Sequence, residues 1–168
     1  MSWKEKLEKL LAKPPEGGKI IFVGVGNTLR GDDGIGVWIA EKLKSAIERD
    51  DVEVLVIGDR VDALPRILRG RRPKLIIFFD AADFHGKPGE IKFMTISETS
   101  GRTISTHDIP IELMLKISEV NAPAYVVGVQ IASIAFGERI TPQVMKAGER
   151  ILEFLIKKLS REGSRPVS

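Results

Sequence analysis

The sequence contains no cysteine among its 168 residues. This absence excludes disulfides, thiolate metal sites and a cysteine nucleophile, and it fits a reducing compartment. No apolar run reaches the length needed to span a membrane, and residues 1–5 lack the pattern of a secretory signal. We therefore expect a cytoplasmic protein that does not insert into a membrane.

Histidines and familiar catalytic motifs are also scarce. The chain has two histidines, His85 and His107, and neither a GxSxG elbow nor an HExxH helix. These absences argue against a serine hydrolase and a classical zinc hydrolase. The net charge is only +3, and basic residues are dispersed among acidic ones, so we expect no nucleic-acid partner.

The length predicts one domain over residues 1–168. Residues 1–15 begin with a capping-box pattern and carry an apolar stripe, which predicts an extra amphipathic helix that docks on the domain or on a partner. From residue 160 onward the sequence is polar, and we expect residues 160–168 to form a frayed tail.

A glycine-rich turn organises the chain. Residues 20–25 form an apolar, β-branched run typical of a buried strand, Gly26 and Gly31 mark a turn, and helical spacing follows. The two glycines have the spacing of a P-loop, but Asp32 and Asp33 stand where Lys and Ser or Thr should follow. Two carboxylates would repel a phosphate, so the expected ligand is a cation. The alternative is that one aspartate merely caps the helix.

Short apolar runs alternate with helical patterns along the rest of the chain. The predicted strands are residues 20–25, 52–57, 75–79, 91–96 and 124–129, and the predicted helices are residues 34–49, 61–70, 108–120 and 141–159. Residues 97–106 are polar and are expected to form a loop. The alternation predicts an α/β fold, a single doubly wound domain with about five mostly parallel strands and helices on both faces.

Three side chains are expected to meet at one edge of this sheet. Asp33 follows the first predicted strand, Asp80 closes the third, and His107 stands at the loop-to-helix junction after the fourth. Ligands of such sheets bind beyond the carboxyl ends of the strands, and two carboxylates with an imidazole suit a divalent transition metal. Plainer accounts exist: Asp80 could bond to a turn, His107 could be a solvated loop residue, and His85 is a competing ligand.

Five segments together resemble the hydrogenase maturation endopeptidases. The first reads GVGNTLRGDDGIG at residues 24–36, and the others are DAAD at 80–83, PGEI at 88–91, the pair Thr106 and His107, and GVQ at 128–130. Their order and spacing are similar to those of the family over about residues 20–159. The members that serve hydrogen-evolving nickel–iron ([NiFe]) hydrogenases are the most similar.

The resemblance implies an endopeptidase that removes a C-terminal peptide from the precursor of the hydrogenase large subunit after nickel insertion. It implies that Asp33, Asp80 and His107 contact the metal and carry the catalysis, and that the substrate supplies the nickel. The turn could also offer backbone amides to the peptide, which makes Gly31 and Asp32 candidate substrate-binding residues. Turn geometry alone is the plainer account of the glycine.

Two other functions stay open at this point. A nickel-sensing or nickel-insertion chaperone without peptidase activity would use the same three ligands, and turnover of excess precursor would distinguish it from an enzyme. A nucleotide-binding α/β protein is favoured by the glycine turn but opposed by Asp32 and Asp33; magnesium-dependent nucleotide binding would support it.

Overall fold

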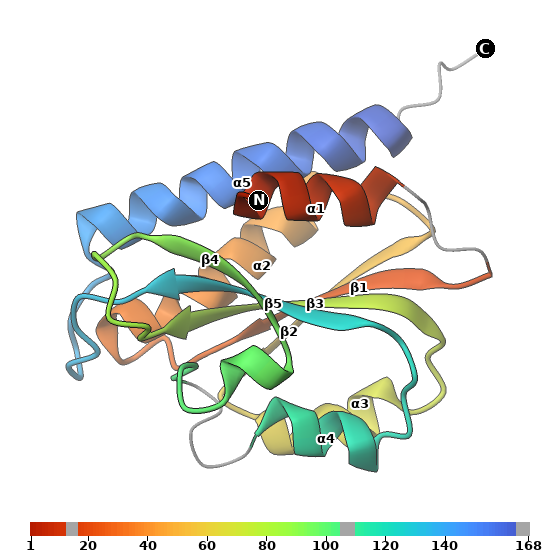
Figure 1. The fold of residues 1–168 in the computed structure, drawn as a ribbon, viewed down its shortest axis with the longest axis horizontal. Helices are drawn as coiled ribbons and strands as arrows, with labels where there is room; N and C mark the ends of the chain where they lie inside the picture. Colours follow the sequence, from red (N-terminus) through yellow and green to blue (C-terminus); the bar gives the residue numbers. More distant parts are fainter. Residues whose placement is uncertain (13–16, 105–109, 164–168) are drawn as a thin grey trace.

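The computed structural model describes residues 1–12, 17–104 and 110–163, and these build a five-stranded sheet with helices on both faces (Figure 1). The strands lie in the order β2-β1-β3-β5-β4. All neighbours pair in parallel except β4, which is antiparallel to β5. This arrangement confirms the predicted α/β class. The strands are β1 (Lys19–Val25), β2 (Val52–Gly58), β3 (Pro73–Ala82), β4 (Ile91–Thr95) and β5 (Ala124–Gln130).

The helices form two layers around the sheet. One face carries α1 (Trp3–Ala12), α2 (Ile35–Ala46) and α5 (Pro142–Gly163), and the other carries α3 (Leu64–Leu68) and α4 (Ile111–Ile117) (Figure 1). The described residues also form three short 3-10 helices: η1 (Gly31–Gly34), η2 (Val61–Ala63) and η3 (Ser97–Thr99).

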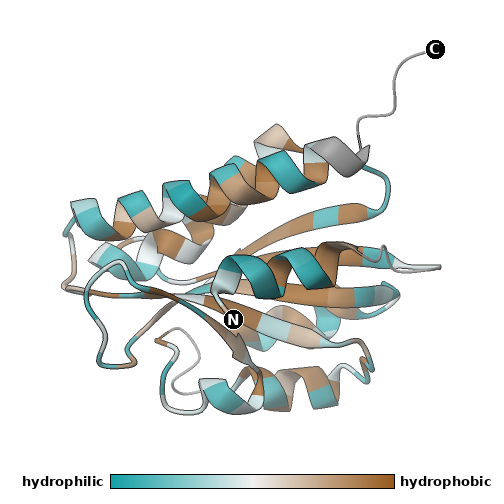
Figure 2. Ribbon diagram, turned by 45° about the horizontal axis from the view of Figure 1, so that its top comes forward, coloured by the Kyte–Doolittle hydropathy of each residue, from teal (hydrophilic) through white to brown (hydrophobic). Residues whose placement is uncertain are grey.

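Both faces of the central strands are buried, which explains their continuous apolar sequences. Phe22 of β1 and Phe79 of β3 lie in the core beneath α2 and α5, with stacked rings whose centroids are 5.7 Å apart. Their neighbours Ile21 and Phe78 lie in the other core, against α3 and α4. In Figure 2 the central strands are accordingly almost wholly hydrophobic, whereas the helices carry mixed colours.

Helix α1 packs on the protein's own fold, as one of the two sequence alternatives proposed. Leu7 is completely buried and Leu11 is almost so, within the core that α5 also covers. The Trp3 ring meets the Phe154 ring of α5 edge to face, with 5.5 Å between centroids. The apolar stripe of α1 is thus buried against other parts of the same chain.

Several predicted boundaries require correction. Strand β3 continues past Asp80 to Ala82, because its last residues still pair with β5. Helix α2 ends at Ala46 rather than near residue 49, because Ile47 is extended (φ −118°, ψ 128°) and packs against the core. Helix α5 continues to Gly163, past its predicted end near residue 159; residues 164–168 lie outside the described part, and the frayed tail stays a prediction.

The predicted loop at residues 97–106 and the helix after it also differ in detail. Residues 97–99 form η3, and Thr103 forms an isolated antiparallel bridge with Ala82 at the end of β3. The following helix, α4, covers Ile111–Ile117, which is shorter than the predicted residues 108–120. The chain therefore returns to the sheet before it enters α4, a path that local composition does not reveal.

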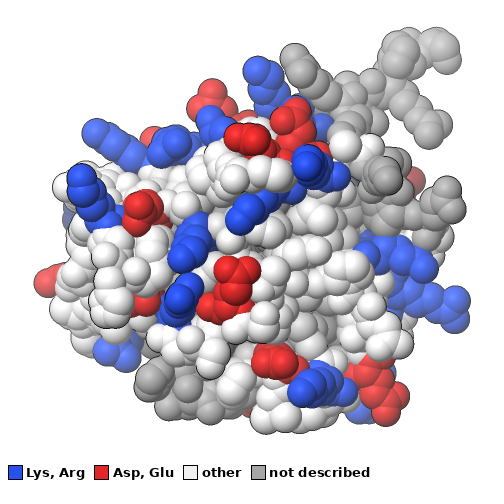
Figure 3. Space-filling view, in the orientation of Figure 1, with Lys and Arg blue, Asp and Glu red and all other residues white. Residues whose placement is uncertain are grey.

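Charges of both signs are interspersed on the face seen in Figure 3. This mixture agrees with the small net charge of +3 and with the absence of a single basic stripe on that face. Among the described residues, no helix is long and apolar enough to cross a bilayer.

Candidate active site

The reversal of strand order between β1 and β3 marks the place to look for a site. From β1 the chain proceeds to β2 on one side of the sheet, and from β3 it proceeds to β4 and β5 on the other. In doubly wound sheets such a switch point opens a crevice at the carboxyl ends of the strands, where ligands bind. Asp33 follows β1, and Asp80 lies close to the end of β3.

A close contact at Gly36 brings these two aspartates to the same edge. A Cβ atom at Gly36 would lie 2.2 Å from the carbonyl oxygen of Phe79 and 2.5 Å from that of Val25. Only glycine fits there, so the first turn of α2 rests directly on the ends of β1 and β3. Asp33 precedes Gly36 by about one helical turn, and Asp80 directly follows Phe79. Cα atoms of η1, which contains Asp33, come within 8 Å of Cα atoms of β3.

Asp33 is buried and its orientation is set by the glycine-rich turn. Only 5% of the residue is exposed, and its Oδ2 accepts a hydrogen bond from the backbone N–H of Asn27 at 3.0 Å. The N-cap of α2 is Gly34, and no side chain in the described part of the chain caps this helix. The alternative in which one aspartate serves only as a helix cap is therefore wrong.

Asp80 is completely buried, beside Gly128 of β5 in the sheet register. Transfer of an ionised carboxylate into a protein interior costs several kcal/mol unless hydrogen bonds or opposite charges compensate. Buried carboxylates in a crevice are for this reason concentrated at functional sites. Asp33 and Asp80 together make the carboxyl edge at the switch point suitable for a divalent cation.

The third predicted ligand, His107, lies outside the described residues, as do Thr106 and Asp108. The backbone N–H of Ile104 donates to the carbonyl of Ala81 at 3.0 Å. The described segment of residues 17–104 therefore ends beside Ala81, the residue that follows Asp80. Within the described residues, no three acidic or histidine side chains cluster as a metal site. The role of His107 stays a prediction.

The competing ligand, His85, is described and lies on the surface. Its side chain is 96% exposed, and its Nδ1 is 4.0 Å from Oδ1 of Asp83. Its backbone N–H donates to the same oxygen at 3.1 Å. The exposed imidazole contrasts with the burial of Asp33 and Asp80.

Asp32 stands next to Asp33 but faces a different part of the chain. Its carboxylate, completely buried, accepts hydrogen bonds from the backbone N–H groups of Ala132, Ser133 and Thr141 at 2.7–3.0 Å. The hydroxyl of Thr141 donates to the same carboxylate at 3.2 Å. The structure thus assigns Asp32 to holding the loop of residues 131–141. Its predicted contact with substrate, and that of Gly31, stays a prediction.

Gly31 connects the turn with the same loop. Its φ of +53° lies in the left-handed region that favours glycine, and a Cβ atom would lie 2.8 Å from the carbonyl oxygen of Ser133. Turn geometry and close approach therefore account for this glycine.

Gln130 holds the loop that follows β3. Its Oε1 accepts hydrogen bonds from the N–H groups of Phe84 and Gly86 at 2.9 and 3.0 Å, and its Nε2 donates to Asp83 at 3.1 Å. The hydrogen bond from Gln130, together with that from the His85 N–H, lowers the pKa of the Asp83 carboxyl. In the sequence, Gln130 was singled out only as part of the GVQ segment that resembles the family. Its role in holding the loop depends on hydrogen-bond partners more than 40 residues away in the chain.

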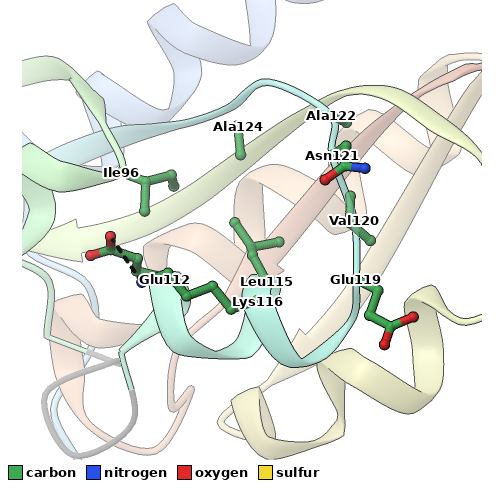
Figure 4. A pocket seen from close by; sticks show the side chains of 9 residues that line it. All are labelled: Ile96, Glu112, Leu115, Lys116, Glu119, Val120, Asn121, Ala122 and Ala124. Atoms are coloured by element: carbon green, nitrogen blue, oxygen red, sulfur yellow. Dashed lines mark ion pairs between the residues drawn. The ribbon is translucent and has the colours of Figure 1, made fainter.

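The opposite edge of the sheet contains a hollow without comparable chemistry. A space of about 420 Å³ lies beside α4, and its lining includes Ile96, Leu115 and Ala124 (Figure 4). The charged residues Glu112 and Lys116 on its rim are exposed and lie 3.9 Å apart as an ion pair. Since Ala124 begins β5, this hollow lies at the amino ends of the strands, away from Asp33 and Asp80.

Comparison with known proteins identifies the family. The sequence profile of the HycI hydrogenase maturation proteases matches residues 37–158, well over half of the chain. The chain belongs to the hydrogenase maturation protease family. It is therefore a peptidase, and this assignment favours the enzyme over the nucleotide-binding alternative.

Individual relatives agree with this assignment. The hydrogenase 3 maturation protease of Escherichia coli K12 is 26% identical over 137 residues, which cover 80% of this chain and 87% of that protein. The crystal structure of the [NiFe] hydrogenase maturation protease HycI from Thermococcus kodakarensis has a TM-score of 0.73 at 28% identity, covering 90% and 99% of the two chains. The hydrogenase maturating endopeptidase HybD of E. coli gives 0.72 at 27% identity, covering 86% and 94%.

Proposed function

We propose that this peptidase removes the C-terminal extension from the nickel-loaded precursor of a [NiFe] hydrogenase large subunit, and that Asp33, Asp80 and His107 bind the precursor's nickel. The observation that carries the proposal is the burial of Asp33 and Asp80 at one switch point of the sheet. The names of the relatives supply the class of substrate.

The donor set fits the metal. Carboxylate oxygens and an imidazole nitrogen are ligands that nickel and other divalent transition metals accept, and three protein ligands leave positions for ligands from the precursor. The nickel belongs to the substrate in this proposal. Its binding at the carboxyl edge would present the scissile peptide bond to the crevice only when the precursor is loaded.

Two chemical routes are compatible with these residues. In the first, the metal polarises the scissile carbonyl or lowers the pKa of a bound water. In the second, a carboxylate takes a proton from water as general base, and the nickel only reports that the precursor is ready. In both, a water oxygen bonds to the carbonyl carbon, the C–N bond breaks, and the leaving amine receives a proton.

The test is a turnover assay. A catalytic amount of the protein is mixed with excess large-subunit precursor, with and without nickel, and the C-terminus of the precursor is followed by mass spectrometry. We expect complete shortening of the nickel-loaded precursor and none of the nickel-free form. Shortening limited to one equivalent, or none, would instead support the chaperone alternative.

Variants then test the site. Asp33→Ala, Asp80→Ala and His107→Ala should each abolish cleavage. Asp59→Ala is the matched control, because Asp59 is an exposed aspartate that follows β2 at the same edge. Full cleavage by the three site variants would refute the assignment of the site, and equal loss in Asp59→Ala would show that the effect is not specific.

A further inference from the structure

Two exposed apolar side chains, Leu29 and Phe136, stand beside the candidate active site. Leu29 is 61% exposed and Phe136 is 76% exposed. Leu29 belongs to the glycine-rich turn after β1, and Phe136 belongs to the loop of residues 131–141 between β5 and α5. We call these two residues the apolar rim.

Hydrogen bonds join the two segments of the apolar rim. The N–H of Gly137, directly after Phe136, donates to the carbonyl of Leu29 at 2.8 Å. The N–H of Asp32 donates to the carbonyl of Ser133 at 3.0 Å. Residues more than 100 positions apart in the chain therefore form one local unit.

The buried carboxylate of Asp32 fixes this unit in place. It accepts three backbone N–H groups and one hydroxyl from the loop of residues 131–141. Exposed apolar side chains on a fixed backbone lose little further freedom when a partner binds, which favours affinity. The fold thus holds Leu29 and Phe136 in defined positions although neither contributes to its core.

The apolar rim is close to the predicted metal site. Asn27, whose N–H donates to Asp33, precedes Leu29 by two residues, so their Cα atoms are at most about 7 Å apart. The N–H of Leu29 also donates to the side-chain oxygen of Asn27 at 2.9 Å. A peptide positioned for attack near Asp33 would therefore pass beside Leu29.

Two charged neighbours of the apolar rim, Arg30 and Glu138, form hydrogen bonds with the loop of residues 131–141. Arg30 donates from Nε to the carbonyl of Ile134 at 3.3 Å. Glu138 accepts a hydrogen bond from the hydroxyl of Ser133 at 2.8 Å. The rim consequently offers apolar contact, which suits an uncharged aliphatic or aromatic side chain.

We propose that Leu29 and Phe136 determine specificity by receiving an apolar side chain from the precursor segment that carries the scissile bond. This inference rests on the proposed function. It adds a recognition element separate from the metal: the nickel would be bound by the carboxylates, while the apolar rim would hold the adjacent peptide.

The test compares Leu29→Ser and Phe136→Ser with Leu113→Ser and Ile117→Ser, which remove exposed apolar side chains from α4. Initial cleavage rates are measured over a range of nickel-loaded precursor concentrations. Each rim variant should raise KM by about tenfold, as for loss of a buried apolar contact, and change kcat by less than about threefold. The α4 variants should match the unsubstituted protein, and Phe136→Leu should restore most of the affinity.

Each other outcome contradicts the inference. Unchanged KM in both rim variants, or the same rise in the α4 variants, would overturn it while leaving the proposed function intact. A dimer of the unsubstituted protein in analytical ultracentrifugation that Phe136→Ser dissociates would assign the rim to self-association instead.

Direct binding separates the inference from the proposed function. If the unsubstituted protein does not cleave the precursor, the proposed function fails. Calorimetric titration of the same precursor then decides the inference: binding weakened about tenfold by the rim variants supports it, and absence of binding, or unweakened binding, refutes it.

Discussion

The two edges of the sheet differ in what they bury. At the carboxyl edge, three carboxylates are buried within or beside the ends of β1 and β3, and the surrounding loops are joined to one another by side-chain hydrogen bonds. At the amino edge, an open space of about 420 Å³ lies beside α4, but its charged residues are exposed, and Glu112 and Lys116 form an ion pair with each other. The two edges therefore differ in whether their carboxylates are buried or exposed.

Buried carboxylates, and not the volume of a hollow, are the reason for placing the candidate site at the carboxyl edge. A carboxylate in water costs nothing to keep ionised, so an exposed rim of glutamates carries little information about function. A buried carboxylate requires compensation from hydrogen bonds or a cation, and the fold retains that cost only where something is gained.

Neutralising one carboxylate at each edge tests whether the two edges differ in function. Asp33→Asn keeps an oxygen that can accept the N–H of Asn27 but removes the charge; we expect cleavage to slow by about 1,000-fold, as for loss of a metal ligand or general base. Glu112→Gln at the amino edge should leave the rate within about twofold. Single-turnover rates followed by mass spectrometry check this, and comparable slowing in both variants would refute the distinction.

Asp32 and Asp33 provide a second contrast, within the carboxyl edge. Asp32→Asn places an amide donor among N–H donors, so the free energy of unfolding should fall by about 2–4 kcal/mol. Asp33→Asn should change it by less than about 1 kcal/mol, because the asparagine oxygen can still accept the Asn27 N–H. Urea denaturation monitored by circular dichroism measures both; a larger loss in Asp33→Asn would reverse the two roles.

A smaller effect concerns the loop held by Gln130. Gln130→Ala removes the donor that lowers the pKa of the Asp83 carboxyl, so this pKa should rise toward its ordinary value. Carbon-13 NMR titration of the side-chain carboxyls measures the shift. Asp62, whose pKa is lowered by the Arg60 guanidinium, serves as the internal control and should not move. An unchanged Asp83 titration would contradict the assigned hydrogen bond.

The smallest expected effect lies at the amino edge, where the Arg49 guanidinium lowers the pKa of the Asp51 carboxyl. Because the folded-state pKa lies below the unfolded value, this pair stabilises the fold above about pH 4, and the contribution is lost as the pH falls through the folded-state pKa. Asp51→Asn should therefore lower the free energy of unfolding at pH 6 by at most about 1 kcal/mol, and by less at pH 3.

Denaturation curves at both pH values check this last prediction, with Asp50→Asn as the control at the adjacent exposed position. A deficit in Asp51→Asn that is equal at pH 6 and pH 3 would show that the pair does not contribute through its charge.

Local patterns were enough to predict the sheet and the positions of two candidate site residues. Strands buried on both faces require continuous apolar runs, so β1 and the middle of β3 were predictable, and so was the place of Asp33 and Asp80 near their ends. Boundaries were less predictable: Asp80 continues in β3 because β5 pairs with it, a fact that depends on a distant segment.

The alternation of strands and helices, the missing motifs and the pair of aspartates after the turn are properties of the chain alone, since each follows from residue type and spacing. The different environments of Asp32 and Asp33 do not follow from the sequence alone. The two are identical neighbours in the sequence, and they differ because a loop about 100 residues away supplies hydrogen-bond donors to Asp32, whereas the N–H of Asn27 donates to Asp33. The exposure of Leu29 and Phe136 beside that loop likewise follows from contacts across the fold, which no local pattern records.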